Sequence, residues 1–282
     1  MTHIRSDPQK AQRAFGECGY QSWEQATLET PLLKGDTAIV TGAGVGIGRA
    51  IAEALAREGA KVLLTDINEA ACSTVAETLS KDGHDAICLV ADLADASASA
   101  RIFDAALKKF GRVSIFVHCA SPYHQEESVS TLAEDAWTQM FDVNVKSGLR
   151  IANLCATHMK ERGIKGRMLL VTSLHAETPR GVPHYSVAKA GVTALMRELA
   201  KAYGPHGIRV NAIAPGIVSA NWFPSADALA NSVAMRRLGR PEEVAGTAVA
   251  LLADRFSGYI NGTTVVVDGG LSLHNWIPGP RG

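Results

Sequence analysis

The chain has 282 residues, 46% of them hydrophobic, and its 28 Lys and Arg residues balance its 28 Asp and Glu residues. A chain with no net charge and no run of basic residues is not expected to bind nucleic acid, and no segment approaches the ~18 apolar residues that cross a membrane. The polar residues 1–30 lack the apolar core of a secretory signal, so we expect a cytoplasmic protein.

Composition divides the chain into three segments. Residues 1–33 are polar, carry mixed charge and show no clear strand, so we expect an N-terminal extension there. Residues 34–270 contain no linker-like stretch of Gly, Ser and Pro, which indicates one domain. Residues 271–282 form a short C-terminal tail, in which Trp276 is expected to lie at a subunit interface.

Apolar runs alternate with segments of helical periodicity along the domain. The predicted strands cover residues 37–40, 61–65, 86–90, 113–117, 168–172, 209–213 and 264–267. The predicted helices cover residues 45–58, 68–81, 96–109, 134–162 and 184–203, and a last helix begins after Pro241. Strands that are apolar throughout and alternate with helices indicate an α/β fold, with a doubly wound parallel sheet that carries helices on both faces.

Three glycines, Gly42, Gly46 and Gly48, lie between the first strand and the first helix. Glycine permits a tight turn and lets a pyrophosphate approach the backbone, and the free N–H groups at the start of a helix favour an anion. A glycine cluster is weak by itself, but its position between a strand and a helix predicts a dinucleotide site.

Two aspartates follow the second and third strands. Asp66 can accept hydrogen bonds from both hydroxyls of the adenosine ribose and would repel a 2′-phosphate, so we expect NAD rather than NADP as the cofactor. Its alternative role is to cap the helix that follows. Asp92 can bind the adenine amino group, cap the next helix, or do both.

Tyr185 and Lys189 are four residues apart on a predicted helix and therefore share one face. A free phenol has a pKa near ~10 and is a poor base at neutral pH unless a cation lies close to it. Lys189 can be that cation, and Ser173 follows the preceding strand. These residues predict a hydride-transfer site that works with the dinucleotide.

The cysteines are odd in number and form no Cys-x-x-Cys pair: Cys18, Cys72, Cys88, Cys119 and Cys155. Neither a disulfide framework nor a metal site is indicated, so we expect free thiols in a reducing cytosol.

Several motifs occur together in a fixed order. They are Thr41-Gly-x-x-x-Gly-Ile-Gly48, Asp92, Asn144 within Phe-Asp-Val-Asn-Val, Ser173, Tyr185-x-x-x-Lys189, Asn211-x-Ile-x-Pro-Gly216, Arg240-Pro-Glu-Glu-Val244 and Val267-Asp-Gly-Gly270. With these motifs the chain resembles the short-chain dehydrogenase/reductase family over nearly the whole core.

The resemblance implies a Rossmann-like domain with about seven parallel strands and a set of catalytic roles. Tyr185 would be the general acid/base, Lys189 would lower its pKa and hold the nicotinamide ribose, and Ser173 would bind the substrate oxygen. Asn144 would help to hold a water in a proton relay that reaches Lys189. The implied cofactor-binding residues are Gly42, Gly46, Ile47, Gly48, Asp66, Asp92, Leu93, Ala120, Tyr185, Lys189, Pro215, Gly216 and Val218.

The chain departs from the family pattern after the fourth strand, where it has His118-Cys-Ala-Ser121 instead of Asn-Asn-Ala-Gly. Ser121 replaces a glycine and either narrows the pocket or adds a hydrogen bond. His118 is expected to be a buried residue with satisfied hydrogen bonds. Thr172 competes with Ser173 as the reactive hydroxyl, and we prefer Ser173. Ser219 lies one place before the threonine that often binds the carboxamide in the family.

The substrate loop is expected over residues 217–238, with a helix through Met235. Trp222 and Phe223 either close an apolar lid or pack the loop down. His175 and His184 flank the reaction centre, where they either contact a polar substrate or have no chemical role.

We therefore expect a NAD(P)-dependent oxidoreductase that acts on a secondary alcohol or ketone, such as a 3-oxoacyl thioester, a sugar or a cyclic alcohol. The alternatives are a non-catalytic dinucleotide sensor and a dehydratase or epimerase on the same fold. The resemblance also implies a homotetramer whose subunits meet through the helices at 134–162 and 184–203.

Overall fold

The structure, a computed structural model, describes residues 31–122, 128–178, 181–219 and 230–273. The chain divides into two units, Met1–Pro31 and Leu32–Gly282, and all the elements described below belong to the second unit. The predicted extension up to residue 30 and the tail from residue 274, with Trp276, lie outside the described residues.

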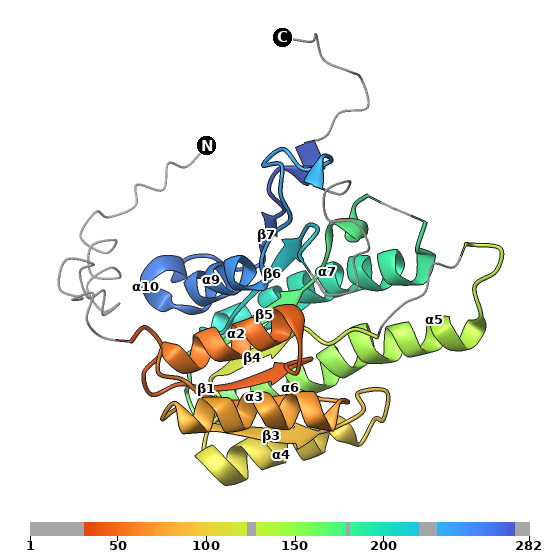
Figure 1. Cartoon of the computed structure of the whole chain (residues 1–282). Coiled ribbons are helices and arrows are strands. Elements are labelled where there is room, and N and C mark those ends of the chain that lie inside the picture. Colours follow the sequence, from red (N-terminus) through yellow and green to blue (C-terminus); the bar gives the residue numbers. More distant parts are fainter. Residues whose placement is uncertain (1–30, 123–127, 179–180, 220–229, 274–282) are drawn as a thin grey trace, which may run out of the picture. The chain divides into compact units, whose positions relative to one another are not determined.

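The centre of this unit is one sheet of seven parallel strands in the order β3-β2-β1-β4-β5-β6-β7 (Figure 1). The strands are β1 Thr37–Thr41, β2 Lys61–Asp66, β3 Ala86–Val90, β4 Ile115–His118, β5 Arg167–Val171, β6 Arg209–Pro215 and β7 Thr264–Val267. The parallel, doubly wound sheet predicted from the sequence is confirmed. The strand order reverses at β1, which pairs with both β2 and β4. In such sheets the crevice at the carboxyl ends of the strands beside this reversal is the usual ligand site.

Helices connect the strands at nearly the predicted positions. They are α2 Gly46–Arg57, α3 Glu69–Lys81, α4 Ala98–Phe110, α5 Glu134–Phe141, α6 Ser147–Glu161, α7 Pro183–Tyr203, α9 Pro241–Leu252 and the short α10 Asp254–Ser257. The long helix predicted at 134–162 contains a π-helical segment, η2 Asp142–Lys146, between α5 and α6. The helix predicted to run through Met235 is wrong over residues 231–235, which form turns and bends.

Two hydrophobic cores cover the two faces of the sheet, and alternate residues of each strand belong to different cores. Helices α2, α3 and α9 pack on one face against residues such as Val40, Leu64 and Val117. Helices α4, α6 and α7 pack on the other face against Ile39, Leu63 and Phe116. Because side chains alternate between the two faces of a strand, an apolar run is buried on both sides only when helices cover both.

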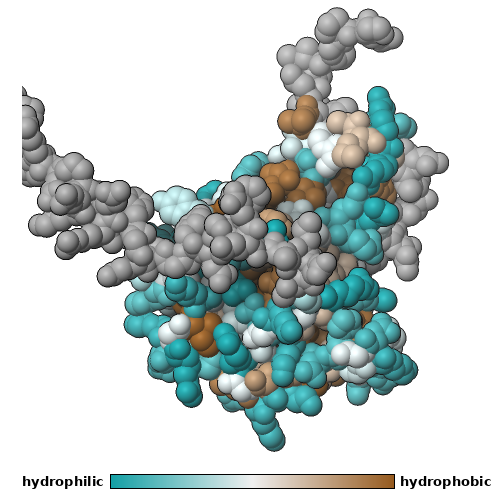
Figure 2. Space-filling view, turned by 90° about the vertical axis from the view of Figure 1, so that its left-hand side faces the viewer, coloured by the Kyte–Doolittle hydropathy of each residue, from teal (hydrophilic) through white to brown (hydrophobic). Residues whose placement is uncertain are grey.

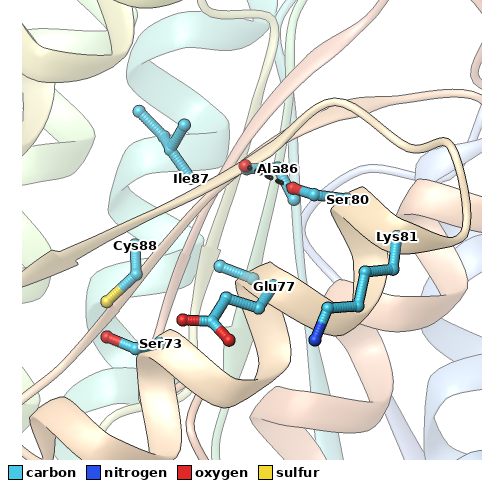
Figure 3. Close-up of a pocket in the computed structure, with 8 residues that line it drawn as sticks. Ser73, Glu77, Ser80, Lys81, Ala86, Ile87 and Cys88 are labelled. Carbon is cyan, nitrogen blue, oxygen red and sulfur yellow. Dashed lines mark hydrogen bonds between the residues drawn. The ribbon is translucent and has the colours of Figure 1, made fainter.

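The cysteines correct one prediction. Cys72 of α3 and Cys88 of β3 form a disulfide, with Cα atoms 5.8 Å apart, whereas Cys119 and Cys155 are free and Cys18 lies outside the described residues. Figure 3 shows Cys88 on β3 beside Ser73 of α3. The spacing of 16 residues gave no signal, because the packing of α3 against β3 brings the two residues together. Because Cys72 and Cys88 are bonded to each other, these two residues do not support the expectation of free thiols in a reducing cytosol.

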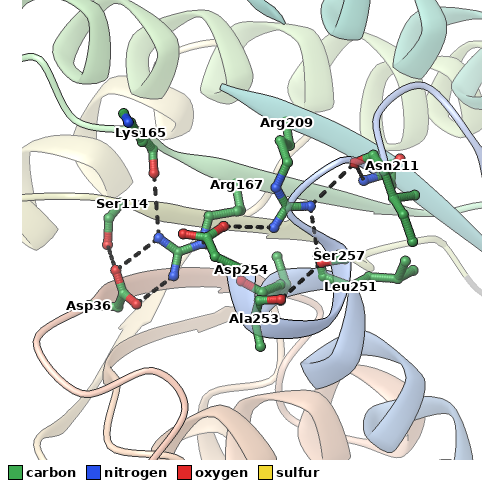
Figure 4. Close-up of polar contacts among 12 residues, drawn as sticks. Asp36, Ser114, Lys165, Arg167, Arg209, Asn211, Leu251, Ala253, Asp254 and Ser257 are labelled. Carbon is green, nitrogen blue, oxygen red and sulfur yellow. Dashed lines mark hydrogen bonds and ion pairs between the residues drawn. The ribbon is translucent and has the colours of Figure 1, made fainter. Parts of the chain in front are cut away.

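A buried polar network joins the amino ends of the central strands, opposite the expected site (Figure 4). Arg167, at the start of β5, binds both carboxylate oxygens of Asp36, at 2.6 and 3.3 Å, and donates to the Leu252 carbonyl at 2.9 Å. The Ser114 hydroxyl donates to Asp36 as well, at 2.8 Å. The Arg167 and Asp36 side chains are only 9% and 13% exposed, so this pair is largely removed from water.

The surface is mixed in polarity. In the face shown in Figure 2, hydrophilic side chains predominate in the lower half and hydrophobic ones gather in smaller patches. The exposed large hydrophobic residues include Trp137, Leu149 and Val187 on helices α5, α6 and α7. Across the described ranges, no helix combines the length and the apolar character needed to span a bilayer.

Asp36→Asn is expected to lower the free energy of unfolding by about 3 kcal/mol, because the buried Arg167 guanidinium then keeps only the more distant and exposed carboxylate of Asp254, at 3.8 Å. For a domain of this size, this corresponds to a melting temperature lower by roughly 6–12 °C. Thermal unfolding followed by circular dichroism measures the change.

The matched control is Asp85→Asn, which removes an exposed partner of Lys61. We expect less than about 1 kcal/mol for this surface pair. Equal losses in the two variants would show that the buried network contributes no more than an ordinary surface contact.

Candidate active site

A cavity of about 350 Å³ opens at the reversal of strand order, beside the carboxyl ends of β1, β2, β3 and β4. Five of the predicted cofactor-binding residues line it: Gly42, Asp66, Asp92, Leu93 and Ala120. Ser121, Gln139 and Thr65 line it too. No sequence pattern indicated Gln139 or Thr65 as site residues, because only the packing of α5 and β2 brings them to this cavity.

The glycine turn between β1 and α2 is held by close backbone approaches. Gly42 has a φ of +65°, and a Cβ there would lie 2.7 Å from the Ala120 Cα, so a larger residue would be both strained and obstructed. A Cβ on Gly48 would overlap the Gly42 carbonyl oxygen. Both positions therefore require glycine for the turn to close against β4 and α2.

The amino end of α2 provides free N–H groups beside this turn. Its N-cap residue, Val45, offers no side-chain cap, and the first turn of the helix carries no acidic residue. Uncapped N–H groups together with the positive end of the helix dipole favour a phosphate. The turn, the helix end and the cavity fit a dinucleotide, with Gly46 and Ile47 at the start of the helix.

Asp66 ends β2 and lines the cavity. One carboxylate oxygen accepts from the Gly44 N–H and the other from the Asn68 N–H, both at 2.9 Å. The alternative role of Asp66 as a helix cap is wrong, because Asn68 caps α3 by accepting from the Ala71 N–H. Asp66 instead fixes the glycine turn and remains at the cavity wall.

Asp92 likewise does not cap a helix. Its carboxylate accepts from the Ala94 N–H at 2.9 Å, whereas α4 begins at Ala98 with Ser97 as its N-cap residue. Asp92 lines the cavity with Leu93, and its contact with the adenine stays a prediction.

Ser173, Tyr185 and Lys189 come together where β5 ends and α7 begins. Ser173 follows β5, and Tyr185 lies in the first turn of α7, which starts at Pro183. Ser173 and Tyr185 form a side-chain hydrogen bond. The Lys189 ammonium nitrogen lies 5.5 Å from the centroid of the Tyr185 ring. The structure thus joins three of the predicted catalytic residues.

The neighbouring Thr172 is occupied by structural contacts. Its hydroxyl is 2.9 Å from the Lys189 carbonyl oxygen and 2.8 Å from the Thr193 hydroxyl, and the residue is 2% exposed. Ser173 points to Tyr185 instead, so the structure favours Ser173 over Thr172.

Burial shifts the pKa values of both Tyr185 and Lys189. It raises the pKa of Tyr185 above its usual value, although the bond with Ser173 opposes this, and it lowers the pKa of Lys189 to about 8. In the chain without a bound ligand, burial outweighs the bond with Ser173, and the lowering of the Tyr185 pKa by Lys189 stays a prediction. Loss of hydration disfavours the charged form of both groups.

The Cys119 thiol belongs to the same electrostatic cluster. Burial raises its pKa to about 11, with a smaller opposing effect of Lys189. A thiol with this pKa is protonated at neutral pH and is a weak nucleophile. Cys119 therefore acts as a neutral neighbour of Lys189.

Asn144 lies in the π-helical segment and is fully buried. Its amide nitrogen donates to the Ser121 hydroxyl at 3.2 Å and to the Met140 carbonyl at 3.0 Å. Its side-chain oxygen has no hydrogen-bond partner among the described residues. The amide is thus held next to the cavity with one acceptor available.

Two sets of predictions remain: the cofactor-binding residues near the end of β6 and the buried histidine at the end of β4. Pro215, Gly216 and Val218 lie at the end of β6 and just beyond it, and Gly216 packs so closely on Asp268 that a Cβ would lie 2.7 Å from the Asp268 Cβ. His118 is buried with two hydrogen bonds, as predicted.

On the substrate side, the His175 ring lies edge-on to Tyr185, with the centroids 5.2 Å apart, and His184 is buried. Ser219 binds the Gly239 carbonyl through its backbone N–H. Trp222 and Phe223 lie outside the described residues. No group of three or more metal-ligating side chains occurs in the part of the chain that the structure covers.

Known proteins match this arrangement along most of the chain. Residues 42–272 match the family model described as enoyl-(acyl carrier protein) reductase. The short-chain reductase protein NovJ of Streptomyces niveus is 35% identical over 87% of this chain and 97% of its own length. The L-rhamnose 1-dehydrogenase (NAD(P)(+)) of Azotobacter vinelandii is 34% identical over 86% of this chain and 99% of its own length.

A solved structure agrees as well. The short-chain dehydrogenase/reductase from Serratia marcescens BCRC 10948 superposes with a TM-score of 0.79 at 33% identity, and the match covers 85% of this chain and 99% of that one. Sequence, fold and the order of the motifs together establish that the chain belongs to the short-chain dehydrogenase/reductase family, in its classical form.

Proposed function

We propose that this chain is an NAD-dependent oxidoreductase that transfers a hydride between the nicotinamide cofactor and a secondary alcohol or ketone. The observation that carries the proposal is the meeting of Ser173, Tyr185 and Lys189 at the same carboxyl edge of the sheet that carries the cavity lined by Asp66. An acid/base and a dinucleotide site next to each other are what alcohol oxidation requires.

In the oxidation direction, Tyr185 accepts the proton of the substrate hydroxyl. Ser173 donates a hydrogen bond to the substrate oxygen and holds it against the phenol. A nicotinamide cofactor held at the glycine turn and by Lys189 would supply the acceptor for the hydride. Lys189 stabilises the phenolate through its positive charge, and its pKa of about 8 keeps it mostly protonated at neutral pH.

Lys189 is anchored for this role. Its ammonium group donates to the Val171 carbonyl at 3.0 Å, and the residue is 3% exposed. A buried ammonium with one fixed bond has two further N–H groups to offer. We assign these to the nicotinamide ribose and to a water that Asn144 helps to hold.

The choice of NAD rests on Asp66. A carboxylate at the cavity wall can accept hydrogen bonds from ribose hydroxyls, and it repels a 2′-phosphate. Its two bonds to backbone N–H groups hold it in place for this contact. The glycine turn 42–48 contains no Lys or Arg that would attract the phosphate of NADP.

The substrate class is a small molecule with a secondary hydroxyl or keto group. Similarity to an L-rhamnose 1-dehydrogenase supports a sugar, and 3-oxoacyl thioesters and cyclic alcohols are the other classes to test. A sensor that binds the dinucleotide without turnover, and a dehydratase or epimerase, are the competing functions.

Tyr185→Phe is expected to lower kcat/KM by on the order of 10³-fold, because the phenol that carries the proton is lost. NADH binding, followed by fluorescence titration, should stay within a few-fold of the unmodified protein. The matched control is Tyr203→Phe at the other end of α7, whose hydroxyl binds Asn153 away from the cavity. Tight NADH binding without turnover of any ketone or alcohol by the unmodified protein would favour a sensor.

Asp66→Asn is expected to shift the ratio of kcat/KM for NADP over that for NAD upward by roughly 10-fold or more, because the repulsion of the 2′-phosphate disappears. The control is Asp92→Asn, which should affect both cofactors alike, since the adenine they share is its expected partner. A preference of the unmodified protein for NADPH would contradict the assignment of Asp66.

We also propose a homotetramer assembled through α5, α6 and α7. The exposed Trp137, Leu149 and Val187 on these helices support it, because large apolar residues at a surface favour association. Sedimentation velocity at micromolar protein should give a species of four chains. A monomer there would refute the assembly.

A further inference from the structure

His118 lies between the two halves of the site. It is the last residue of β4, it is 1% exposed, and its ring contacts the end of β1 on one side and the π-helical segment on the other. The Nδ1 atom is 2.9 Å from the Thr41 hydroxyl, and the Nε2 atom is 3.0 Å from the Asn144 carbonyl oxygen.

The surrounding groups determine which ring nitrogen carries the proton. The Thr41 hydroxyl oxygen accepts from the N–H groups of Cys119 and Ala120, at 3.1 and 3.3 Å. These bonds use both of its lone pairs, so its proton is donated to Nδ1 of His118. The Nε2 atom then carries the ring proton and donates it to the Asn144 carbonyl, which can only accept.

The neutral ring is stable in this place. Burial, the largest effect, and the nearby Lys189 charge together lower the pKa of His118 to about 4, against a smaller raising effect of the Asn144 and Val143 backbone. At neutral pH the ring therefore presents one acceptor to Thr41 and one donor to Asn144.

The contact at Asn144 falls on an irregular part of the backbone. In a π-helical turn the carbonyl groups are displaced from the α-helical pattern, and such turns are frequent at functional sites. The Ser147 hydroxyl donates a hydrogen bond to the Val143 carbonyl at 2.6 Å, and the His118 ring donates one to the Asn144 carbonyl. The side chain of the same Asn144 reaches Ser121 at the cavity.

Gly148 provides the space for the ring. A Cβ on Gly148, in the first turn of α6, would lie 2.9 Å from Cδ2 and 3.1 Å from Nε2 of His118. Glycine at position 148 therefore leaves the space that the His118 ring fills.

We propose that His118 is a positioning residue that, seated against Gly148, sets the backbone of Asn144 relative to the glycine turn. Its bond to Thr41 fixes the ring to the start of the cofactor site, and its bond to Asn144 fixes the group beside Ser121. The effect on rate rests on the proposed function, whereas the seating of the ring rests on the contacts alone.

Two substitutions separate the two bonds of the ring. In His118→Gln the amide nitrogen can take the place of Nε2 and keep the donor to Asn144. In His118→Asn the shorter side chain keeps a partner for Thr41 and loses the donor to Asn144. We expect kcat to fall by about 10- to 100-fold in His118→Asn, through displacement of Asn144, and to stay within a few-fold in His118→Gln. The KM for NADH should change little in either variant.

A double-mutant cycle tests the seating independently of activity. Gly148→Ala should lower the melting temperature in the unmodified background, because the new methyl group meets the ring. In the His118→Asn background the same change should cost much less, since the ring is gone. Two-dimensional ¹H–¹⁵N spectra of histidine-labelled protein should show a pyridine-type Nδ1 and a pyrrole-type Nε2 for the signal that His118→Gln removes.

The outcomes are distinct. Additive melting-temperature losses, or a proton on Nδ1, would overturn the seating of the ring. Equal kcat values in the unmodified protein and His118→Asn would overturn the positioning role. An unmodified protein that turns over no substrate would refute the proposed function, while the cycle and the spectra still decide the seating of His118.

Discussion

The parallel direction of all seven strands is the constraint on which the site depends. Because parallel strands end on the same edge of a sheet, residues from distant parts of the sequence meet there. Asp66 ends β2, His118 ends β4 and Ser173 follows β5. The amino ends meet on the opposite edge, where Arg167 and Asp36 join β5 to the start of β1. The buried polar network therefore lies at the amino edge of the sheet, and the candidate active site lies at its carboxyl edge.

Removal of water governs the electrostatics at the carboxyl edge. Burial disfavours the Tyr185 phenolate and the Lys189 ammonium at once, although a pKa of about 8 still leaves Lys189 mostly protonated at neutral pH. A ligand that brings positive charge to the cavity would shift this balance toward the phenolate. The charge of a bound ligand would therefore affect the protonation of Tyr185.

Two departures from the family pattern are connected through one residue. His118 binds the backbone carbonyl of Asn144, and Ser121 accepts from the side-chain amide of the same residue. Thr41 extends this chain of contacts to the end of β1. The substitutions at 118 and 121 therefore act on the same element, the π-helical turn, and Gly148 leaves the room that the larger residue at 118 needs.

The sequence by itself determined the features that depend on neighbours in the chain. Apolar runs between helical segments predicted the strands, glycine spacing predicted the turn before α2, and the four-residue spacing of Tyr185 and Lys189 predicted their shared helix face. Tertiary structure alone decided the Cys72–Cys88 pairing, the π-helical turn and the direction of the Tyr185 pKa shift. These depend on burial and on contacts between residues far apart in the chain, which local patterns do not encode.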